Sequence, residues 1–231
     1  MFAMEPIWGR PEAAAYGPRP AHSRDAVAGA GVRIADAEGI AAVSMRRVAA
    51  ELNAGTTSLY RYLKSKDELL DLMVDKVLRE DEPPGPSGAW KADLRVLAEH
   101  ARAMMLERPW LAEAMMARPR IGPGALRWSE AWLSIVGDRG RDADEMLTVA
   151  STVMKFVFGA VMWELSERGA GYDPQSWMDA QGAYGDAIIA GGRYPHLIRT
   201  MVEAEGPHSA DRHQRSFSQG MEHLLNGLEA A

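Results

Sequence analysis

The chain has 231 residues, of which 47% are apolar and 25% are charged, and it contains no cysteine. This length suits one large domain or two small ones, and the composition is that of a globular protein with a hydrophobic core. The lack of cysteine excludes disulfides, thiolate metal ligands and cysteine nucleophiles. The net charge of −6 argues against a protein that coats nucleic acid without specificity.

Residues 1–20 contain four prolines and no compact apolar segment behind a basic start, so they do not resemble a secretory signal. No uninterrupted apolar run in the chain approaches the ~18 residues that suggest a membrane span. We therefore expect a flexible N-terminal arm over residues 1–20 and a cytoplasmic protein that has no membrane partner.

The next part of the chain is predicted to form three helices. Residues 23–38 carry an apolar stripe at steps of three and four, and Gly39 ends that helix. Ser44 is a suitable N-cap for a second helix, which runs to Leu52. The third helix begins near Thr56 and is short.

A fourth helix follows Ser65, because Glu68 stands three residues after this N-cap and completes a capping-box pattern. The segment EDEPPGPSG, residues 80–88, cannot continue a helix. It separates a head, residues 21–81, from a second domain, residues 89–231. Alternating strand patterns are nearly absent. The sequence therefore predicts an all-α fold, with further helices near 90–107, 109–117, 123–137, 144–168, 176–190, 194–204 and 210–230.

Residues 44–63 have the pattern of a helix-turn-helix, in which the second helix enters the DNA major groove. Asn53 falls at the turn, and asparagine tolerates a left-handed backbone better than any residue except glycine. Leu59 and Leu63 are expected to point inward. Between Ser44 and Lys66 five cations accompany one carboxylate, a local excess that suits a focused contact with phosphates.

The outer face of the second helix is predicted to carry hydroxyls, phenol rings and one guanidinium, on Thr56, Thr57, Ser58, Tyr60, Arg61 and Tyr62. A guanidinium such as that of Arg61 can bind a guanine edge in bidentate fashion, whereas hydroxyls and Lys66 suit phosphates. The alternative is a polar helical hairpin whose arginines are only solvated.

The run AGTTSLYRYLKSKDELLDLM, with the preceding VSMRRVAAEL, resembles the recognition helix and its flanking helices in the TetR family of bacterial repressors. This resemblance covers residues 23–78. It implies a three-helix DNA-binding head, joined by the fourth helix to an all-helical dimerisation and effector domain. Asn53 departs from the family's usual glycine, and Gly55 from its usual capping serine. The resemblance implies DNA contacts at Ser44, Arg46, Thr56, Thr57, Tyr60, Arg61, Tyr62 and Lys66, to which the local cations and hydroxyls add Arg47 and Ser58.

The last helix, SFSQGMEHLLNGLEAA, resembles the terminal helix of the tetracycline-repressor branch, which pairs across the dimer. Its apolar stripe consists of Phe217, Gly220, Met221, Leu224, Leu225 and Leu228. The expected helix over 144–168 offers Val153, Val157, Ala160 and Val161, so that two helices from each chain form a four-helix interface. The alternative is a core helix that never meets a second subunit.

Six of the seven tryptophans and ten of the fourteen methionines follow residue 88. Methionine adapts to irregular shapes, which suits a pocket for hydrophobic ligands. The residues predicted to line such a pocket are His100, Met104, Met105, Trp110, Met115, Trp128, Trp132, Met154, Phe158 and Trp163. The alternative is ordinary core packing.

No Gly-x-Ser-x-Gly elbow, phosphate loop or His-Glu-x-x-His motif occurs, so we predict no enzyme activity, no cofactor and no metal site. The sequence predicts a ligand-responsive repressor that binds a near-palindromic operator as a homodimer and releases it when a hydrophobic or aromatic small molecule binds. Repression rather than activation is implied by the resemblance alone. The alternatives are a ligand-independent DNA-binding regulator and a helical small-molecule binder without DNA activity.

Overall fold

The computed structural model describes residues 6–12, 22–117, 120–137, 142–171, 173–204, 209 and 211–229. These residues form α-helices and short 3₁₀ turns and include no strand, so the predicted all-α fold is confirmed. The chain divides into two compact units, residues 1–151 and 152–231. The predicted boundary at 80–88 lies inside the first unit, because helices on both sides of it pack together.

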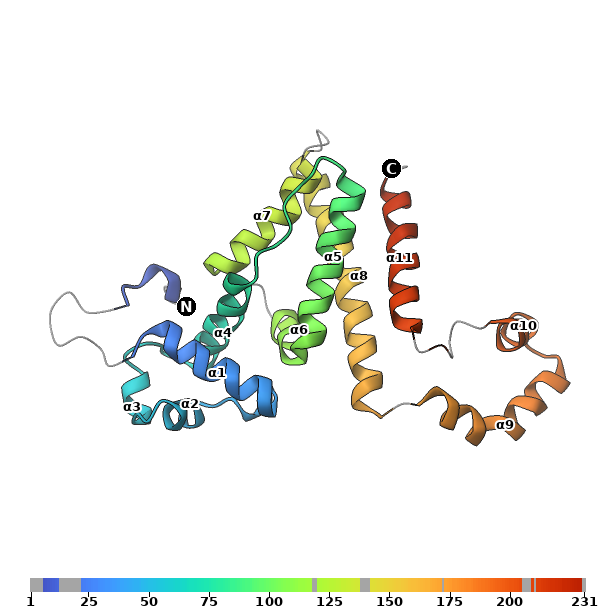
Figure 1. Cartoon of the computed structure of the whole chain (residues 1–231), viewed down its shortest axis with the longest axis horizontal. Coiled ribbons are helices and arrows are strands. Elements are labelled where there is room, and N and C mark those ends of the chain that lie inside the picture. Colours follow the sequence, from blue (N-terminus) through green and yellow to red (C-terminus); the bar gives the residue numbers. More distant parts are fainter. Residues whose placement is uncertain are drawn as a thin grey trace, which may run out of the picture. The chain divides into compact units, whose positions relative to one another are not determined.

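The head consists of four helices, coloured blue to teal in Figure 1. Their bounds are α1 (Arg24–Glu38), α2 (Met45–Glu51), α3 (Thr56–Leu59) and α4 (Lys66–Glu80), with 3₁₀ turns η1 (Ile7–Gly9) and η2 (Ile40–Ala42). Each of α1, α2 and α4 begins at a serine whose hydroxyl accepts a backbone N–H three residues later. These caps satisfy backbone donors that a helix leaves unpaired, which explains why the sequence starts helices there.

The capping box at the start of α4 differs in one bond from the predicted pattern. The Ser65 hydroxyl accepts the Glu68 N–H at 3.2 Å, as expected. The Glu68 carboxylate, however, accepts the N–H of Lys64 at 2.6 Å, one residue before the cap. This carboxylate also pairs with Arg10, which the sequence pattern did not include.

Helix α4 joins the head to the rest of the first unit. It packs against α1 and also against α6 (Pro109–Ala117) and α7 (Pro123–Gly137), while α5 (Trp90–Glu107) packs on α6 and α7. The buried Asp75 of α4 accepts the Gly124 N–H at 2.7 Å and so caps the start of α7. A side chain at Gly124 would lie 2.7 Å from the Asp75 carbonyl oxygen, so glycine is needed for this close approach.

The remaining helices are α8 (Ala143–Gly169), which begins in the first unit, α9 (Pro174–Gly191), α10 (Pro195–Glu203) and α11 (Arg212–Glu229). Their bounds agree with the predicted ranges to within one or two residues. In the second unit α11 packs on α8: the rings of Phe156 and Phe217 lie 5.4 Å apart, and a Cβ at Gly220 would meet Phe156. Glu167 accepts a hydrogen bond from Arg212 at 2.7 Å.

The N-terminal segment is partly ordered against the head. Within the predicted flexible arm, Ile7 is 2% exposed and belongs to a 3₁₀ turn. Arg10 forms a shielded ion pair with Glu68. Residues 6–12 of the predicted flexible arm thus have contacts with the head, and the remainder of that range lies outside the described residues.

Candidate functional site

The turn between α2 and α3 has the geometry that the sequence predicted. Asn53 adopts a positive φ of 52°, and it is the only described residue other than glycine to do so. Behind the turn, Leu59 and Leu63 are buried in the head, at 0% and 1% exposure. Both predictions are confirmed, so the local packing holds α3 with its polar side outward.

Helix α3 is shorter than predicted, because it ends at Leu59 and continues as hydrogen-bonded turns. The N–H groups of Arg61 and Tyr62 donate to the carbonyls of Ser58 and Leu59, at 3.2 and 2.9 Å. These turns continue the helical path of α3 beyond Leu59 as far as Tyr62. As a result Tyr60 is 54% exposed and Arg61 lies beside it on the surface.

Tyr62 does not face outward as predicted. Its side chain is 4% exposed, and its hydroxyl accepts the backbone N–H of His22 at 3.1 Å. The ring is buried because the segment before α1 covers it. The outward-facing prediction is therefore wrong for Tyr62, whose phenol joins the turns after α3 to His22, just before α1.

The other candidate DNA contacts are accessible at the surface of the head. Exposed or half-buried side chains are found at Ser44, Arg46, Arg47, Thr56, Thr57, Ser58, Tyr60, Arg61 and Lys66. Three of them already have partners within the chain, beginning with the Ser44 hydroxyl, which accepts the Arg47 N–H at 3.2 Å. Arg47 pairs with Glu38 at 2.7 Å, and the Ser58 hydroxyl donates to the Gly55 carbonyl at 2.6 Å. We name the set Tyr60, Arg61 and Lys66, with the threonines of α3, the reading surface.

Ion pairs connect α1 to α4 behind this surface. Lys76 and Arg79 of α4 lie 3.0 and 2.9 Å from the two carboxylate oxygens of Asp25. The hydrogen bond from Lys76, and then that from Arg79, outweigh burial and hold the pKa of Asp25 below its ordinary value. Since Asp25 is half exposed, each pair contributes at most about 1 kcal/mol. Their effect is to keep α1 and α4 in a defined relation.

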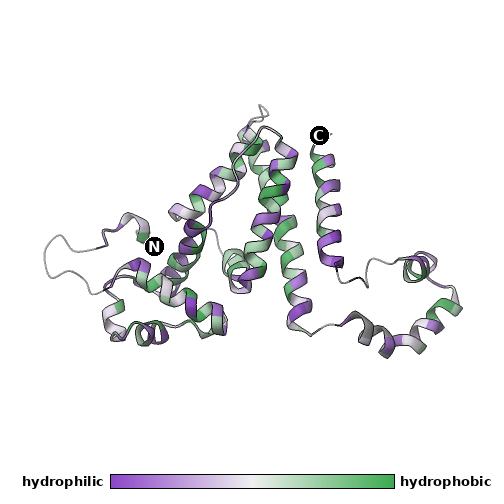
Figure 2. Cartoon of the chain, in the orientation of Figure 1, coloured by the Kyte–Doolittle hydropathy of each residue, from purple (hydrophilic) through white to green (hydrophobic). Residues whose placement is uncertain are grey.

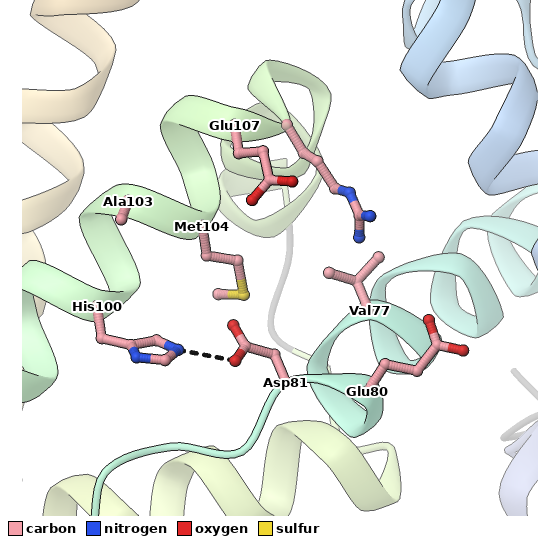
Figure 3. A pocket seen from close by; sticks show the side chains of 8 residues that line it. Val77, Glu80, Asp81, His100, Ala103, Met104 and Glu107 are labelled. Atoms are coloured by element: carbon pink, nitrogen blue, oxygen red, sulfur yellow. Dashed lines mark hydrogen bonds and ion pairs between the residues drawn. The ribbon is translucent and has the colours of Figure 1, made fainter.

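A cleft of about 410 Å³ opens between the end of α4 and the face of α5 (Figure 3). Its lining residues are Val77, Glu80, Asp81, His100, Ala103, Met104, Glu107 and Arg108. At one end the His100 ring lies 2.8 Å from Asp81, and Met104 points into the space beside them. Trp128 packs behind His100 with ring centroids 5.6 Å apart. The volume is in the range of small-molecule sites.

Of the ten residues predicted to line a pocket, the structure brings only His100 and Met104 to this cleft. Two of the predicted tryptophans are core residues whose indole N–H groups are already used: Trp110 donates to Asp36 at 2.6 Å, and Trp128 to the Leu78 carbonyl at 3.2 Å. Met105 and Trp132 are also buried, whereas Trp163 is 69% exposed and donates to Glu167. The remaining predicted residues, Met115, Met154 and Phe158, are half-buried and do not line the cleft. No sequence pattern indicated that the carboxylates of Glu80, Asp81 and Glu107 would line the cleft.

Six of the ten predicted interface residues are buried within the single chain, at 3% exposure or less: Val153, Val157, Val161, Phe217, Met221 and Leu225. They are core residues, because α11 closes on α8 through Phe156 and Gly220 in the same chain. The other four, Ala160, Gly220, Leu224 and Leu228, are half-buried. The predicted interface role is therefore not open to the six buried residues within this packing, and for the other four it stays a prediction.

Helix α8 leaves much apolar surface open. It is the one described helix that is long and apolar enough, by length and composition, to cross a membrane, and only 28% of its most apolar stretch is buried within the chain. Much of its ribbon is green in Figure 2. A helix of this character also occurs where two bundles meet. Among the described residues no cluster of histidines and carboxylates suits a metal ion.

Comparison with known proteins identifies the class. The profile of the family "Bacterial regulatory proteins, tetR family" matches residues 29–73, and that of "Tetracyclin repressor-like, C-terminal domain" matches residues 82–231. The HTH-type transcriptional repressor DrrR1 of Streptomyces coeruleorubidus is 36% identical, over 98% of this chain and 84% of that protein. An HTH-type transcriptional regulator of Saccharopolyspora erythraea is 30% identical, over 97% of this chain and 91% of that protein.

Solved structures show the same fold. Apo ActR from Streptomyces coelicolor superposes with a TM-score of 0.77 at 28% identity, covering 93% of this chain and all of ActR. ActR in complex with actinorhodin superposes with a TM-score of 0.74 at 27% identity, covering 91% of this chain and 96% of that one. The chain belongs to the TetR family: it is a transcriptional repressor with a helix-turn-helix head and a helical C-terminal domain, and it is not an enzyme.

Proposed function

We propose that this chain acts in the cytoplasm as a homodimeric repressor that binds a near-palindromic operator and releases it when a hydrophobic or aromatic small molecule binds. The observation that carries this proposal is the position of α4. This helix is tied to α1 through Asp25, and it also lines the cleft through Val77 and Glu80. A molecule that moves the end of α4 therefore acts directly on the element that carries the reading surface.

Direct readout is assigned to Arg61. Its exposed guanidinium lies next to Tyr60 at the end of α3, and a bidentate contact to guanine suits this position. Lys66 and the threonine hydroxyls would contact phosphates and fix the register. Two such surfaces in a dimer would occupy successive major grooves, about 34–36 Å apart or a multiple of that.

The second copy is supported by unburied apolar side chains on the C-terminal helices. Trp163 of α8, Trp177 and Tyr184 of α9, and Leu197 and Val202 of α10 are all 49–69% exposed. Apolar surface that a chain leaves open is a feature of interaction sites. The partner proposed for these helices is a second copy of the chain, because a palindromic operator requires two reading surfaces.

The effector site is assigned to the cleft between α4 and α5. His100 and Asp81 supply polar contacts there, and Val77 and Met104 supply apolar ones. ActR was solved in complex with actinorhodin, which makes this compound a suitable first probe for the present chain. Release of DNA requires that the ligand bind the DNA-free form better than the bound form.

The central experiment selects DNA sites from random duplexes with the purified full-length chain at a stated salt concentration. We expect a near-palindrome, and we expect Arg61→Ala to weaken binding to it by about 1–3 kcal/mol. Arg199→Ala is the control, because Arg199 is an exposed α10 residue that pairs with Glu203. If no palindrome is enriched and Arg61→Ala leaves the affinity unchanged, the proposal is wrong.

A second experiment tests the effector half of the proposal. Actinorhodin is titrated against the protein while tryptophan fluorescence is recorded, because Trp128 lies directly behind His100. Binding should weaken the affinity for the selected operator, and saturating operator should weaken actinorhodin binding by the same factor. If neither actinorhodin nor other planar aromatic compounds change operator affinity, the ligand-independent alternative is favoured.

A further inference from the structure

One arginine of α1 binds several carbonyl groups of residues 6–12, which we name the strap. The guanidinium of Arg24 donates through Nη1 to the carbonyls of Ile7 and Arg10, at 2.9 and 2.8 Å, and through Nη2 to that of Pro11 at 3.3 Å. Its Nε donates to the carbonyl of Tyr62 at 3.1 Å. A single side chain therefore binds both the strap and Tyr62, at the end of the turns that follow α3.

A second connection joins the strap to the start of α4. Arg10 Nη2 lies 2.6 Å from Glu68 Oε1, and the two side chains are only 13% and 10% exposed. Glu68 also accepts the Lys64 N–H and donates its own N–H to Ser65. Burial favours a higher pKa for Glu68, but the ion pair with Arg10 and the hydrogen bond from the Lys64 N–H outweigh it and hold the pKa below its ordinary value. Glu68 is therefore an ionised carboxylate, and each of its two oxygens has a partner: Arg10 at Oε1 and the Lys64 N–H at Oε2.

The strap also touches the junction of α4 and α7. A Cβ at Gly122 would lie 2.7 Å from Cζ2 of Trp8 and 2.1 Å from Oδ1 of Asp75. Gly122 is buried just before α7, and Asp75 caps that helix. The strap therefore contacts, within the first unit, both the start of α4, through Arg10, and the junction of α4 and α7, through Trp8.

We propose that the strap positions the reading surface relative to α4 and α7, with Arg10 and Arg24 as positioning residues for operator binding. This inference rests on the proposed function. Both guanidiniums are used inside the chain, by Glu68 and by backbone carbonyls, so their role is to fix residues 62–68 and not to contact phosphate. Without the strap the reading surface occupies its binding geometry for a smaller fraction of the time, and the apparent affinity falls by that fraction.

The test compares Arg10→Met with Arg33→Met in the full-length chain. Arg33 is a matched control because it also forms an ion pair in the head, with Glu51, but its side chain is 60% exposed. Circular dichroism and sedimentation establish first that both variants fold and assemble like the parent. The readouts are the affinity for the selected operator at several salt concentrations and the hydrogen exchange of the amides of residues 62–68.

We expect Arg10→Met to weaken operator binding by about tenfold, which corresponds to about 1.4 kcal/mol. The slope of log K against log salt should stay unchanged, and exchange at residues 62–68 should become faster. Glu68→Gln should have the same effect, and the double variant should lose no more than either single variant. Arg33→Met should change neither readout.

Two results would overturn the assignment. Unchanged affinity and unchanged exchange in Arg10→Met would show that the strap positions nothing. A salt slope lower by about one would show that Arg10 contacts a phosphate instead. If the parent chain selects no DNA site, the proposed function fails by itself, and the exchange measurement still decides whether the strap orders residues 62–68.

Discussion

The head and the C-terminal helices use apolar side chains in opposite ways. In the head, Leu59, Leu63 and Leu69 are at most 1% exposed, and they bury one face each of α3 and α4. In α10 no side chain is buried, although leucine, isoleucine, methionine and valine make up four of its nine residues. The head is complete within one chain, whereas α10 presents an apolar face that the chain does not cover.

This difference in burial fits two different requirements, those of a surface that reads DNA and those of a surface that binds a second copy of the chain. A reading surface needs fixed geometry, which the head obtains from its own core and from the ion pairs of Asp25 and Glu68. An assembly surface needs apolar area that becomes buried only when a partner arrives. Single-chain burial therefore predicts where a substitution will lower stability and where it will lower association.

The largest expected effect is at Leu69 of α4, which is fully buried. Leu69→Ala should lower the free energy of unfolding by about 2–5 kcal/mol, because it removes packed methyl groups and leaves a cavity. Leu197→Ala on α10 is the matched control; this side chain is 49% exposed, and its loss should change stability by less than about 0.5 kcal/mol. Urea denaturation followed by circular dichroism measures both. Equal losses would abolish the distinction between the two regions.

The next effect concerns association. Trp163→Glu on α8 places a charge on the open apolar face and should raise the dimer dissociation constant by roughly 30-fold, the equivalent of about 2 kcal/mol. Leu126→Glu on α7 is the control, because Leu126 is similarly exposed, at 57% against 69%, but lies in the first unit. Sedimentation over a concentration series measures the constant. An unchanged value for Trp163→Glu, or an equal change in the control, would place the interface elsewhere.

The same contrast explains what could be predicted from the sequence. Helix starts at Ser44 and Ser65 are local signals, since each serine caps the helix that follows it. The stripe of Leu59 and Leu63 is also local, and so is the left-handed turn at Asn53. These features needed only neighbours within a few residues, and all are found in the structure.

The predictions that failed depend on contacts between distant residues. Tyr62 was expected outside because its helix position is polar, but His22, forty residues earlier, covers it. The contacts of Glu68 and Arg24 with residues 6–12 also join segments far apart in the sequence, and no local pattern indicated them. The cleft was expected to be apolar, and the linker residue Asp81 lines it instead. A periodic pattern shows which face of a helix is apolar, but not which segment covers that face.

The third prediction concerns Asn53, whose backbone conformation could be predicted from neighbouring residues alone. Asn53→Ala should lower stability by about 1–2 kcal/mol, because alanine at a φ of 52° brings its Cβ close to the backbone without a polar side chain to compensate. Asn53→Gly is the control and should be close to neutral or slightly stabilising, since glycine adopts this conformation freely. Thermal unfolding of the two variants measures the difference. If both variants unfold alike, the turn does not determine the stability of the head.

The smallest effect is the pH dependence of the two regions. The pKa of Glu68 in the head is lowered by Arg10 and Lys64 against the effect of burial, and that of Glu167 in the second unit is lowered chiefly by Arg212. A lowered pKa means that the folded chain favours the carboxylate, so each pair stabilises above the ordinary glutamate pKa, and this contribution is lost as the pH falls from about 4.5 through the lower folded value.

The measurement is the urea midpoint of Glu68→Gln and Glu167→Gln against the parent at several pH values. Both differences should shrink toward zero in acid. At neutral pH the loss should be larger at Glu68, whose pair is 10–13% exposed, than at Glu167, whose side chain and that of Arg212 are 23% and 21% exposed, because water screens the second pair more strongly. A larger loss at Glu167 would mean that its ion pair stabilises the second unit more than the Glu68 pair stabilises the head, although the Glu68 pair is the more deeply buried of the two.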